Sequence, residues 1–238
     1  MPLTWLKDTV NDLLGLMYPN MCIGCMQNSL PTRKGFLCVD CIADLPFNHH
    51  FESPYNNELV ERFYGRFPVH YAVSLFYFMA DNAVQKMMHA FKYKEEKYIG
   101  QQLGKLLGEN FRNHLSRDLP ELLVPVPLHR DKLISRGFNQ SEIIATSLGE
   151  VTGTKVLPNA LVKLIDTHSQ TQMSRTERME NLKNVFAVSE KSLPLLKGRH
   201  VLLIDDTVTT GATLESCARQ LLNNGAQKVS VACIAMAK

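Results

Sequence analysis

Apolar residues recur along the chain with two different periods, which predict where strands and helices lie. Short runs rich in β-branched and aromatic residues predict strands over Val73 to Met79, Leu122 to Val126, Val201 to Ile204 and Lys228 to Met236, with a weaker strand pattern over Lys155 to Leu164. Apolar residues three and four positions apart predict helices over Asn82 to Phe91, Tyr98 to Leu115, Ser141 to Glu150 and Thr213 to Asn223, the last stopped by Gly225. This alternation indicates an α/β domain with a mainly parallel sheet flanked by helices.

The first eighteen residues carry an apolar stripe of their own, through Leu3, Leu6, Val10, Leu13, Leu14 and Met17. Asp8 and Asp12 interrupt the stripe and no small-residue cleavage site follows, so the pattern predicts an amphipathic helix and not a signal peptide. No run approaches the roughly 20 apolar residues that a membrane-spanning helix needs. We therefore expect a cytoplasmic protein without membrane insertion.

Composition adds little to this picture. Of the 238 residues 45% are hydrophobic and 21% are charged, which is typical of a globular protein, and the net charge of +3 permits contact with phosphates or nucleic acid without requiring it. The length suits a modest domain with a small appendage. We expect the appendage, a leading helix with a metal-binding module, in residues 1–52 and the α/β domain in residues 53–238.

Four of the six cysteines form two CxxC pairs, Cys22 with Cys25 and Cys38 with Cys41, in the turn-rich stretch from Pro19 to Phe51. Two-residue spacing lets both thiolates of a pair reach one ion, and two such pairs complete a tetrahedral zinc site. A site closed by four thiolates has no open coordination position. The pattern therefore predicts structural Zn²⁺.

Other interpretations of these cysteines fit less well. Two disulfides would require an oxidising compartment, for which the chain carries no export signal. A redox CxxC motif would be single and would open a helix after a strand. His49 and His50 follow closely, but four thiolates already satisfy zinc, so we expect both histidines at the surface.

The segment from Val201 to Thr213 (VLLIDDTVTTGAT) carries the most chemistry. An apolar strand is expected to end in Asp205 and Asp206, and a Thr/Gly-rich loop then opens a helix. Open α/β sheets bind ligands at this kind of junction. Amides at the helix N-terminus and threonine hydroxyls can cradle a phosphate, and Gly211 allows close backbone approach. The two carboxylates suit the hydroxyls of a sugar, and also Mg²⁺.

The segment from Val201 to Thr213 also has a purely structural interpretation. The acid pair could begin a turn, and Thr210 could cap the helix. The flanking strands and helix fall where a ligand loop requires them, which favours the functional interpretation. A Walker-type loop is excluded, because no Gly-Lys-Ser/Thr follows the strand.

This segment resembles the 5-phosphoribosyl 1-pyrophosphate (PRPP) signature of type I phosphoribosyltransferases. The ordered blocks PVPLHR from Pro125 to Arg130, RGFNQ from Arg136 to Gln140, and the polar stretch from Thr171 to Phe186 then resemble the competence protein F (ComF, ComFC) family. A four-cysteine module ahead of the transferase domain also fits that family. The resemblance spans nearly the whole chain, and its most specific part is the conjunction of the module, RGFNQ and DDTVTTGAT.

The resemblance implies a role for each part of the PRPP site. The diol of the ribose would be held by Asp205 and Asp206, and the 5′-phosphate would be surrounded by Thr207, Val208, Thr209, Thr210, Gly211 and Thr213. The turn from Val124 to Arg130 would take the place of the pyrophosphate loop, with Arg130 and Arg136 facing the diphosphate and its Mg²⁺. The stretch from Asp166 to Asn184 would be the mobile loop, with Arg175 and Arg178. These arginines also suit solvated surface positions.

Two functions follow from the resemblance. The first is a phosphoribosyltransferase that displaces pyrophosphate from the ribose anomeric carbon with a nitrogen nucleophile; the sequence names neither the base nor the acceptor. The second is a non-catalytic, PRPP-sensing competence protein that binds single-stranded DNA and DNA-uptake proteins. Basic and aromatic residues interleave at Lys92, Lys94, Lys97 and Tyr98, which could stack bases and contact phosphates. The same pattern is typical of an amphipathic helix end with solvated lysines, which the sequence favours.

Overall fold

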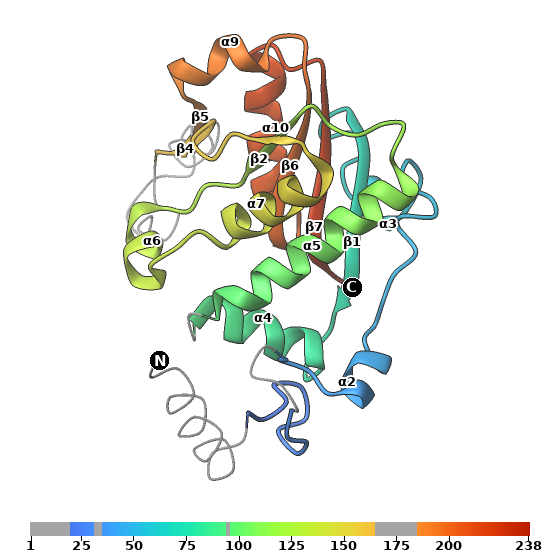
Figure 1. The fold of residues 1–238 in the computed structure, drawn as a ribbon. Coiled ribbons are helices and arrows are strands. Elements are labelled where there is room, and N and C mark those ends of the chain that lie inside the picture. Colours follow the sequence, from blue (N-terminus) through green and yellow to red (C-terminus); the bar gives the residue numbers. More distant parts are fainter. Residues whose placement is uncertain (1–19, 31–34, 94–95, 165–184) are drawn as a thin grey trace, which may run out of the picture.

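The architecture was obtained as a computed structural model that describes residues 20–30, 35–93, 96–164 and 185–238 (Figure 1). The predicted N-terminal amphipathic helix lies outside the described residues. In the part of the chain that is described, no helix is long and apolar enough to cross a membrane.

The centre of the molecule is a five-stranded sheet of order β1-β7-β6-β2-β3 in which every neighbouring pair is parallel. The strands are β1 (Val69–Phe78), β2 (Leu122–Pro125), β3 (Lys155–Val156), β6 (His200–Val208) and β7 (Lys228–Ala237). Two further strands, β4 (Leu161–Lys163) and β5 (Phe186–Val188), form a separate antiparallel pair. The predicted α/β class with a mainly parallel sheet is confirmed.

Helices cover the sheet and connect its strands. In the described ranges the long helices are α4 (Ala83–Tyr93), α5 (Lys97–His114), α7 (Gln140–Thr152) and α10 (Ala212–Asn223), and each lies within about two residues of its predicted range. Short helical segments, which the periodicity did not predict, are α2 (Val39–Ala43), α3 (Glu58–Glu61), α6 (Arg130–Arg136), the 3₁₀ turn η2 (Glu190–Ser192) and α9 (Leu193–Leu196).

Two apolar layers hold these elements together, one on each face of the sheet. One layer contains Leu202 and Ile204 of β6 and the buried faces of α4, α5 and α7; the other contains Val201 and Leu203 and the buried face of α10. Figure 1 shows α5 and α7 crossing in front of the strands. A strand that alternates between two buried layers has to be apolar throughout, which explains the continuous run from Val201 to Ile204.

Close packing of α5 on α7 depends on small residues. A Cβ atom added at Gly104 would lie 2.6 Å from the carbonyl oxygen of Ile144, and one at Gly108 would lie 2.8 Å from Cβ of Val151. Residues four apart lie on one helical face, so these glycines form a flat surface on which α7 rests. This contact holds α7 against α5, and α7 also packs against β6.

The described part of the N-terminal segment packs at the carboxyl edge of the sheet. The Tyr77 amide of β1 donates to the Pro46 carbonyl (2.9 Å), and the Lys86 ammonium of α4 donates to the Gly24 carbonyl (2.6 Å). Because all strands of the sheet are parallel, their carboxyl ends share this edge, and Figure 1 shows the segment beneath it. The division at residue 52 stays a prediction.

Candidate functional site

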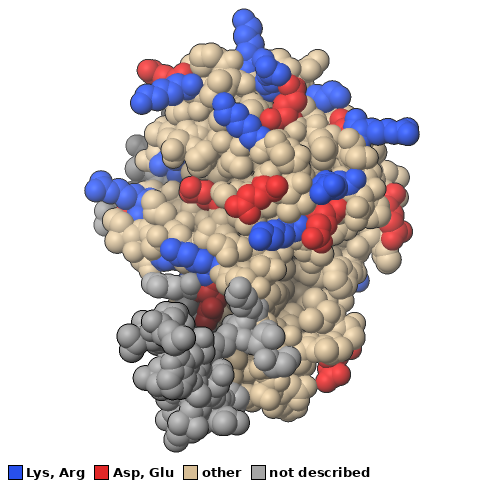
Figure 2. All heavy atoms as spheres, in the orientation of Figure 1, with Lys and Arg blue, Asp and Glu red and all other residues tan. Residues whose placement is uncertain are grey.

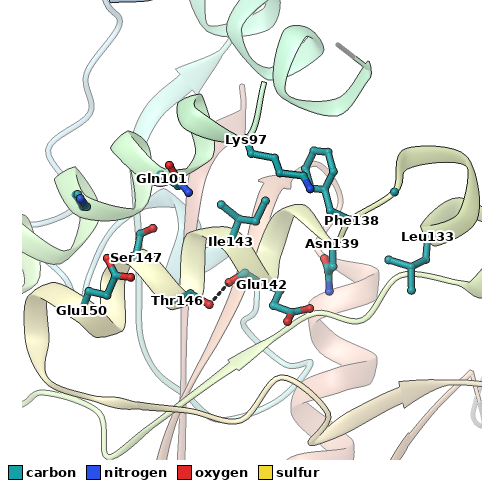
Figure 3. A pocket seen from close by; sticks show the side chains of 12 residues that line it. Lys97, Gln101, Leu133, Phe138, Asn139, Glu142, Ile143, Thr146, Ser147 and Glu150 are labelled. Atoms are coloured by element: carbon teal, nitrogen blue, oxygen red, sulfur yellow. Dashed lines mark hydrogen bonds between the residues drawn. The ribbon is translucent and has the colours of Figure 1, made fainter. Parts of the chain in front are cut away.

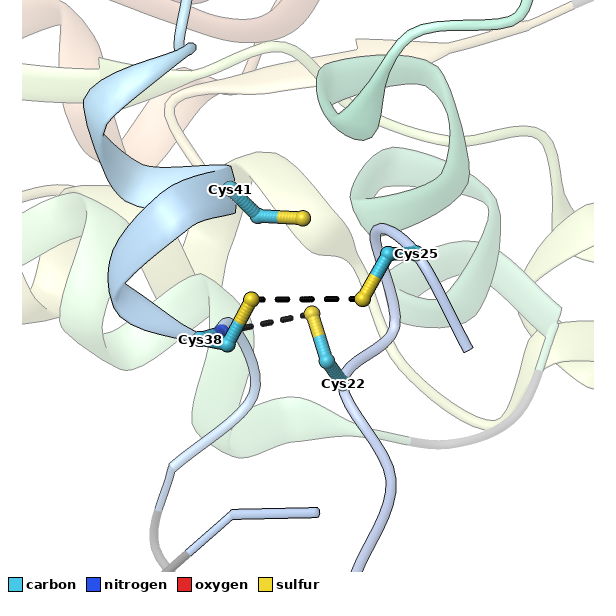
Figure 4. A group of neighbouring side chains, drawn as sticks. All are labelled: Cys22, Cys25, Cys38 and Cys41. Carbon is cyan, nitrogen blue, oxygen red and sulfur yellow. Dashed lines mark hydrogen bonds between the residues drawn. The ribbon is translucent and has the colours of Figure 1, made fainter. Parts of the chain in front are cut away.

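The four cysteines of the CxxC pairs converge on one point (Figure 4). Their Sγ atoms all lie within 4.8 Å of one another, and Sγ of Cys25 is 3.9 Å from Sγ of Cys38. Tetrahedral zinc with Zn–S bonds of about 2.3 Å would separate its sulfurs by about 3.8 Å. The cluster therefore has the size of a metal site, and none of the six cysteines forms a disulfide.

The hydrogen bonds around the cluster suit thiolates. The backbone N–H of Cys38 donates to Sγ of Cys22 (3.2 Å), and the backbone amides of Asn28 and Gln27 lower the pKa of Cys25 to about 6. Burial and the neighbouring thiols raise the pKa of Cys41 to about 12. Four thiols this close cannot all ionise by themselves, and a bound cation removes that conflict. These residues therefore fit a four-thiolate metal ion.

The two nearby histidines behave differently from each other. His49 is exposed and lies 2.8 Å from a Glu52 carboxylate oxygen. His50 is only 3% exposed, and its Nδ1 lies 3.1 Å from the Ser74 hydroxyl, so the expected surface position is wrong for this residue. Burial lowers the pKa of His50 to about 4. The residue belongs to the packing around β1.

The acid pair lies at the carboxyl edge of the sheet, but inside a strand. β6 continues through both aspartates to Val208, because Asp205, Thr207 and Val208 pair with Cys233, Ala235 and Met236 of β7. The expectation that the strand stops at Ile204 is therefore wrong. Asp205 is half-buried and Asp206 is 9% exposed, so the segment is extended and partly open, as a ligand edge requires.

Each aspartate is held by a different helix. The Ser141 hydroxyl, in the first turn of α7, donates to Oδ1 of Asp205 (3.0 Å), while the Lys92 ammonium, in the last turn of α4, lies 2.8 Å from Oδ2 of Asp206. Burial raises the pKa of Asp205 to about 7, and the charge of Asp206 acts in the same direction. The edge thus carries one carboxylate paired with a cation and a second that holds its proton unusually well.

The loop after β6 surrounds a small hollow of about 50 Å³, which is lined by residues 205 and 207–214. Its backbone is held from outside by two arginines next to α3. Arg62 donates to the Thr209 carbonyl and to the Ala237 carbonyl (2.8 Å), and Arg66 donates to the Thr210 carbonyl (2.6 Å). Since N–H and C=O point opposite ways in a peptide group, the next amides in the loop point away from the arginines.

The helix that follows begins at a glycine. Gly211 is the N-cap of α10 with φ of +79°, and a Cβ atom there would lie 2.8 Å from the Phe63 ring. Gly211 has no side chain that could cap the helix, and the Thr210 hydroxyl accepts from the Ala212 amide (3.4 Å), as the structural interpretation of Thr210 expected; the next amides of the first turn remain available to an anion. The Thr207 hydroxyl is buried and has no hydrogen-bond partner among the described residues, which is uncommon without a ligand. Thr209, Thr210 and Thr213 are exposed at the loop.

The arginine candidates lie at different distances from this site. Arg130 opens α6 and is exposed. Arg136 ends α6, donates to Oε1 of Gln140 (3.0 Å) and lies with its guanidinium carbon 5.4 Å from the Tyr93 ring centroid. That contact brings it to the end of α4 that carries Lys92. Arg175 and Arg178 lie outside the described residues.

A larger groove of about 660 Å³ runs between α5 and α7 (Figure 3). Lys97 and Lys105 line one wall, Glu142 and Glu150 the other, and the Lys97 ammonium lies 5.1 Å from the centroid of the Phe138 ring. Figure 2 shows basic and acidic side chains interspersed on the face of the molecule that includes these helices. The groove is therefore of mixed charge.

Sequence reasoning missed four residues that hold the acid pair and its loop: Lys92, Ser141, Arg62 and Arg66. Ser141 follows the RGFNQ block directly, which is a local signal. The sequence pattern predicts that Lys92 is a solvated lysine, and its ion pair with Asp206 shows that this prediction is wrong. The two arginines lie about 145 positions from the carbonyls they hold in the loop, and no local pattern marks them.

Comparison with known proteins relates part of this chain to a family of transferase domains. Residues 135–238 match the Phosphoribosyl transferase domain family. The chain is 32% identical over 151 residues to competence protein F of Haemophilus influenzae, covering 61% of this chain and 64% of that protein. It is 34% identical over 151 residues to DNA utilization protein YhgH of Escherichia coli, covering 62% and 65%. The chain thus spans slightly less than two thirds of these relatives.

Among solved structures, the chain is similar to glutamine PRPP amidotransferase from B. subtilis complexed with ADP and GMP. The TM-score is 0.41 at 21% identity, covering 56% of this chain and 25% of that one. This similarity is low, and the fold class follows instead from the parallel sheet and the matched domain. The resemblance found in the sequence is confirmed: the chain is a homologue of competence protein F and of YhgH that carries a phosphoribosyl transferase domain.

Proposed function

We propose that the protein binds PRPP at the carboxyl edge of the sheet. The 5′-phosphate would lie against the amides and hydroxyls of residues 207–213, and Asp205 and Asp206 would accept hydrogen bonds from the ribose hydroxyls. One observation carries this proposal: a small hollow and an acid pair, of which Asp205 is half-buried and Asp206 buried, adjoin at the end of one strand. The unpaired Thr207 hydroxyl supports it.

The reaction we propose is phosphoribosyl transfer to a nitrogen acceptor. A bond forms between the acceptor nitrogen and the anomeric carbon, the bond from that carbon to the diphosphate oxygen breaks, and pyrophosphate leaves. Positioning and electrostatics dominate such chemistry. Mg²⁺ bound with the diphosphate would supply charge neutralisation for the leaving group. The chain's own contribution would be to fix the sugar through the acid pair and the phosphate through the loop.

The cysteine cluster would hold a structural Zn²⁺ ion, and the protein would act in the cytoplasm, where thiols stay reduced. The names of the relatives suggest a process in which DNA is taken up or used. DNA-uptake proteins are accordingly the partners that we propose.

Calorimetric titration with PRPP and Mg²⁺ tests the binding site. We expect saturable binding to the wild type and none to Asp205→Asn/Asp206→Asn, because amides give the ribose hydroxyls weaker acceptors and the Mg²⁺ no charge. The variant Glu109→Gln/Glu190→Gln removes the same charge from two exposed acids elsewhere and should bind like the wild type. A wild type that binds no PRPP contradicts the proposal. Release of pyrophosphate with one of a series of nitrogen acceptors tests the transfer step separately.

A second function is supported by the groove between α5 and α7. We propose as an alternative that the protein senses PRPP without turnover and binds single-stranded DNA, with Lys97 and Lys105 contacting phosphates. Lys94 lies outside the described residues, and Lys92 pairs with Asp206. Binding to a labelled single strand should then weaken steeply with salt and on Lys97→Gln/Lys105→Gln. Affinity that is indifferent to both excludes this alternative.

A further inference from the structure

Lys92 stands at the acid pair without belonging to the loop or to the matched domain, which begins at residue 135. Its ammonium lies 2.8 Å from Oδ2 of Asp206, and the side chains are 22% and 12% exposed. Lysine is seldom buried to this extent unless it is paired. An ammonium has three donors, and a single carboxylate oxygen uses one of them. Lys92 therefore retains capacity for another anion at the same place.

The position of Lys92 indicates which anion that is. The hollow at the phosphate loop is lined by residues 205 and 207–214 and by none from α4, so Lys92 meets the acid pair from outside this hollow. A phosphopentose whose 5′-phosphate occupies the loop and whose hydroxyls meet the acids must extend its anomeric carbon beyond them. The substituent on that carbon then comes to the side of the acid pair on which α4 ends.

Arg136 provides a second cation near the same end of α4. The Arg136 guanidinium lies 5.4 Å from the ring of Tyr93, which is the residue after Lys92. Arg136 is half-buried, and its Nη1 donates to the buried Gln140. Lys92 at the acid pair and Arg136 near the same helix end thus bring together two cations that can neutralise a diphosphate.

We propose that Lys92 is a diphosphate-binding residue of this site, an inference that rests on the PRPP site proposed above. In the structure described here Lys92 neutralises Asp206, and with PRPP bound it donates also to the diphosphate on the anomeric carbon. Lys92 thereby distinguishes a pentose phosphate that carries a diphosphate from one that does not.

The opposing explanation is that the ion pair only anchors α4 to β6. That role would affect every ligand of the acid pair alike, because it acts through the position of Asp206. A comparison of ligands with and without the diphosphate therefore separates the two roles. Ribose 5-phosphate has the same phosphate and the same two ring hydroxyls as PRPP but lacks the diphosphate.

The experiment measures PRPP affinity by calorimetry with Mg²⁺, and the affinities of ribose 5-phosphate and pyrophosphate by competition against PRPP. For Lys92→Met we expect PRPP and pyrophosphate to bind at least about tenfold more weakly, since a charge-assisted bond is lost, with ribose 5-phosphate little changed. Lys92→Arg should recover part of the loss. Lys191→Met removes an exposed lysine of the 3₁₀ turn η2 and should leave all three affinities unchanged.

Each other outcome has one meaning. An equal loss for PRPP and ribose 5-phosphate reduces Lys92 to a positioning residue and overturns the proposal. Unchanged PRPP affinity in Lys92→Met overturns it as well. If the wild type binds neither pentose phosphate, the proposed function fails, and this inference fails with it for a distinguishable reason. Should Lys92→Met unfold, Lys92→Gln replaces it, because glutamine can still donate a hydrogen bond to Asp206.

Discussion

The cysteine cluster and the acid-pair edge are both candidate ligand sites, and they are built in opposite ways. The cluster gathers its atoms locally: the Cys38 amide and the Cys22 sulfur that it contacts are 16 positions apart. The edge gathers its atoms across the fold: the contact between Arg62 and Ala237 spans 175 positions. A local sequence motif specifies the first site, whereas the second forms only when the sheet brings its residues together.

Burial differs between the two regions as much as chain distance does. In the described residues between 20 and 45, only Cys22, Gly24 and Leu37 are buried. By contrast β6 is buried from His200 to Ile204, between two apolar layers. A segment with so little core cannot hold its structure by apolar burial alone. The comparison therefore predicts that the module depends on a bound metal for order, while the acid-pair edge is ordered without a ligand.

The largest predicted effect is a loss of zinc and of ordered structure in the cysteine module, with the sheet left intact. In Cys38→Ser the site loses one of four thiolates, and we expect the protein to lose its stoichiometric zinc, because binding of a structural zinc ion supplies roughly 10 kcal/mol or more of folding free energy. Elemental analysis measures the zinc, and hydrogen exchange should report lost protection in residues 20–45 with retained protection in β6 and β7.

Cys217→Ala is the matched control for this substitution. Cys217 is a fully buried cysteine of α10 outside the cluster, so its replacement should lower stability by about 1 kcal/mol and keep the zinc. If exchange in residues 20–45 stays slow without metal, the contrast between the two regions is wrong.

The same contrast explains how far sequence reasoning reached. The CxxC pairs and the α/β class were predictable, because a metal motif and apolar periodicity are local signals. The extent of β6 was not. Its apolar run stops at Ile204, yet the ladder to β7 continues through Thr207 and Val208, since pairing with a buried neighbour overrides the polarity of the acids.

Residues that reach the site from other elements were also beyond local patterns. Lys92 has the pattern of the solvated end of an amphipathic helix, and only the packing of α4 on α5 and β1 turns it toward Asp206. The turn expected from Val124 to Arg130 is likewise replaced at its end by α6, which begins at Arg130 because the His129 side chain accepts from the Asp131 amide as an N-cap.

A smaller effect tests whether the acid-pair edge is preformed down to its backbone. Gly211→Ala adds a Cβ at φ of +79° and 2.8 Å from the Phe63 ring. We expect a loss of about 1–2 kcal/mol from the left-handed conformation and roughly 1–3 kcal/mol more from the contact. PRPP affinity should fall too, because the first amides of α10 are displaced. Denaturant unfolding and calorimetry measure the two quantities.

Gly198→Ala separates the two causes. Gly198 has φ of +71° but nothing within 4 Å of its added Cβ, so this variant should show only the backbone cost and unchanged PRPP affinity. Equal stability losses in the two variants would mean that the loop gives way easily around Phe63. The edge would then be adaptable instead of preformed.

The smallest predicted effect is a pH-dependent difference in unfolding free energy that results from the burial of Asp205. Because burial raises the pKa of Asp205 from 3.8 to about 7, the folded state holds a proton that the unfolded state releases, and stability falls as pH rises through this window. Asp205→Asn keeps the acceptor for Ser141 and removes the ionisation. Between about pH 5 and about pH 6 the variant should therefore gain up to about 1.4 kcal/mol in unfolding free energy relative to the wild type.

This difference between variant and wild type isolates Asp205 from other titrating groups. Burial also lowers the pKa of His200 to about 4, which makes the stability of both proteins rise with pH in the same range and cancels in the comparison. Urea unfolding at several pH values measures the gap. A difference in unfolding free energy between variant and wild type that stays constant with pH would place the Asp205 pKa near its ordinary value. Burying the acid pair would then cost the protein no electrostatic free energy in the absence of a ligand. A gap that opens with rising pH would mean that the fold itself, without ligand, keeps Asp205 buried and close to the charge of Asp206.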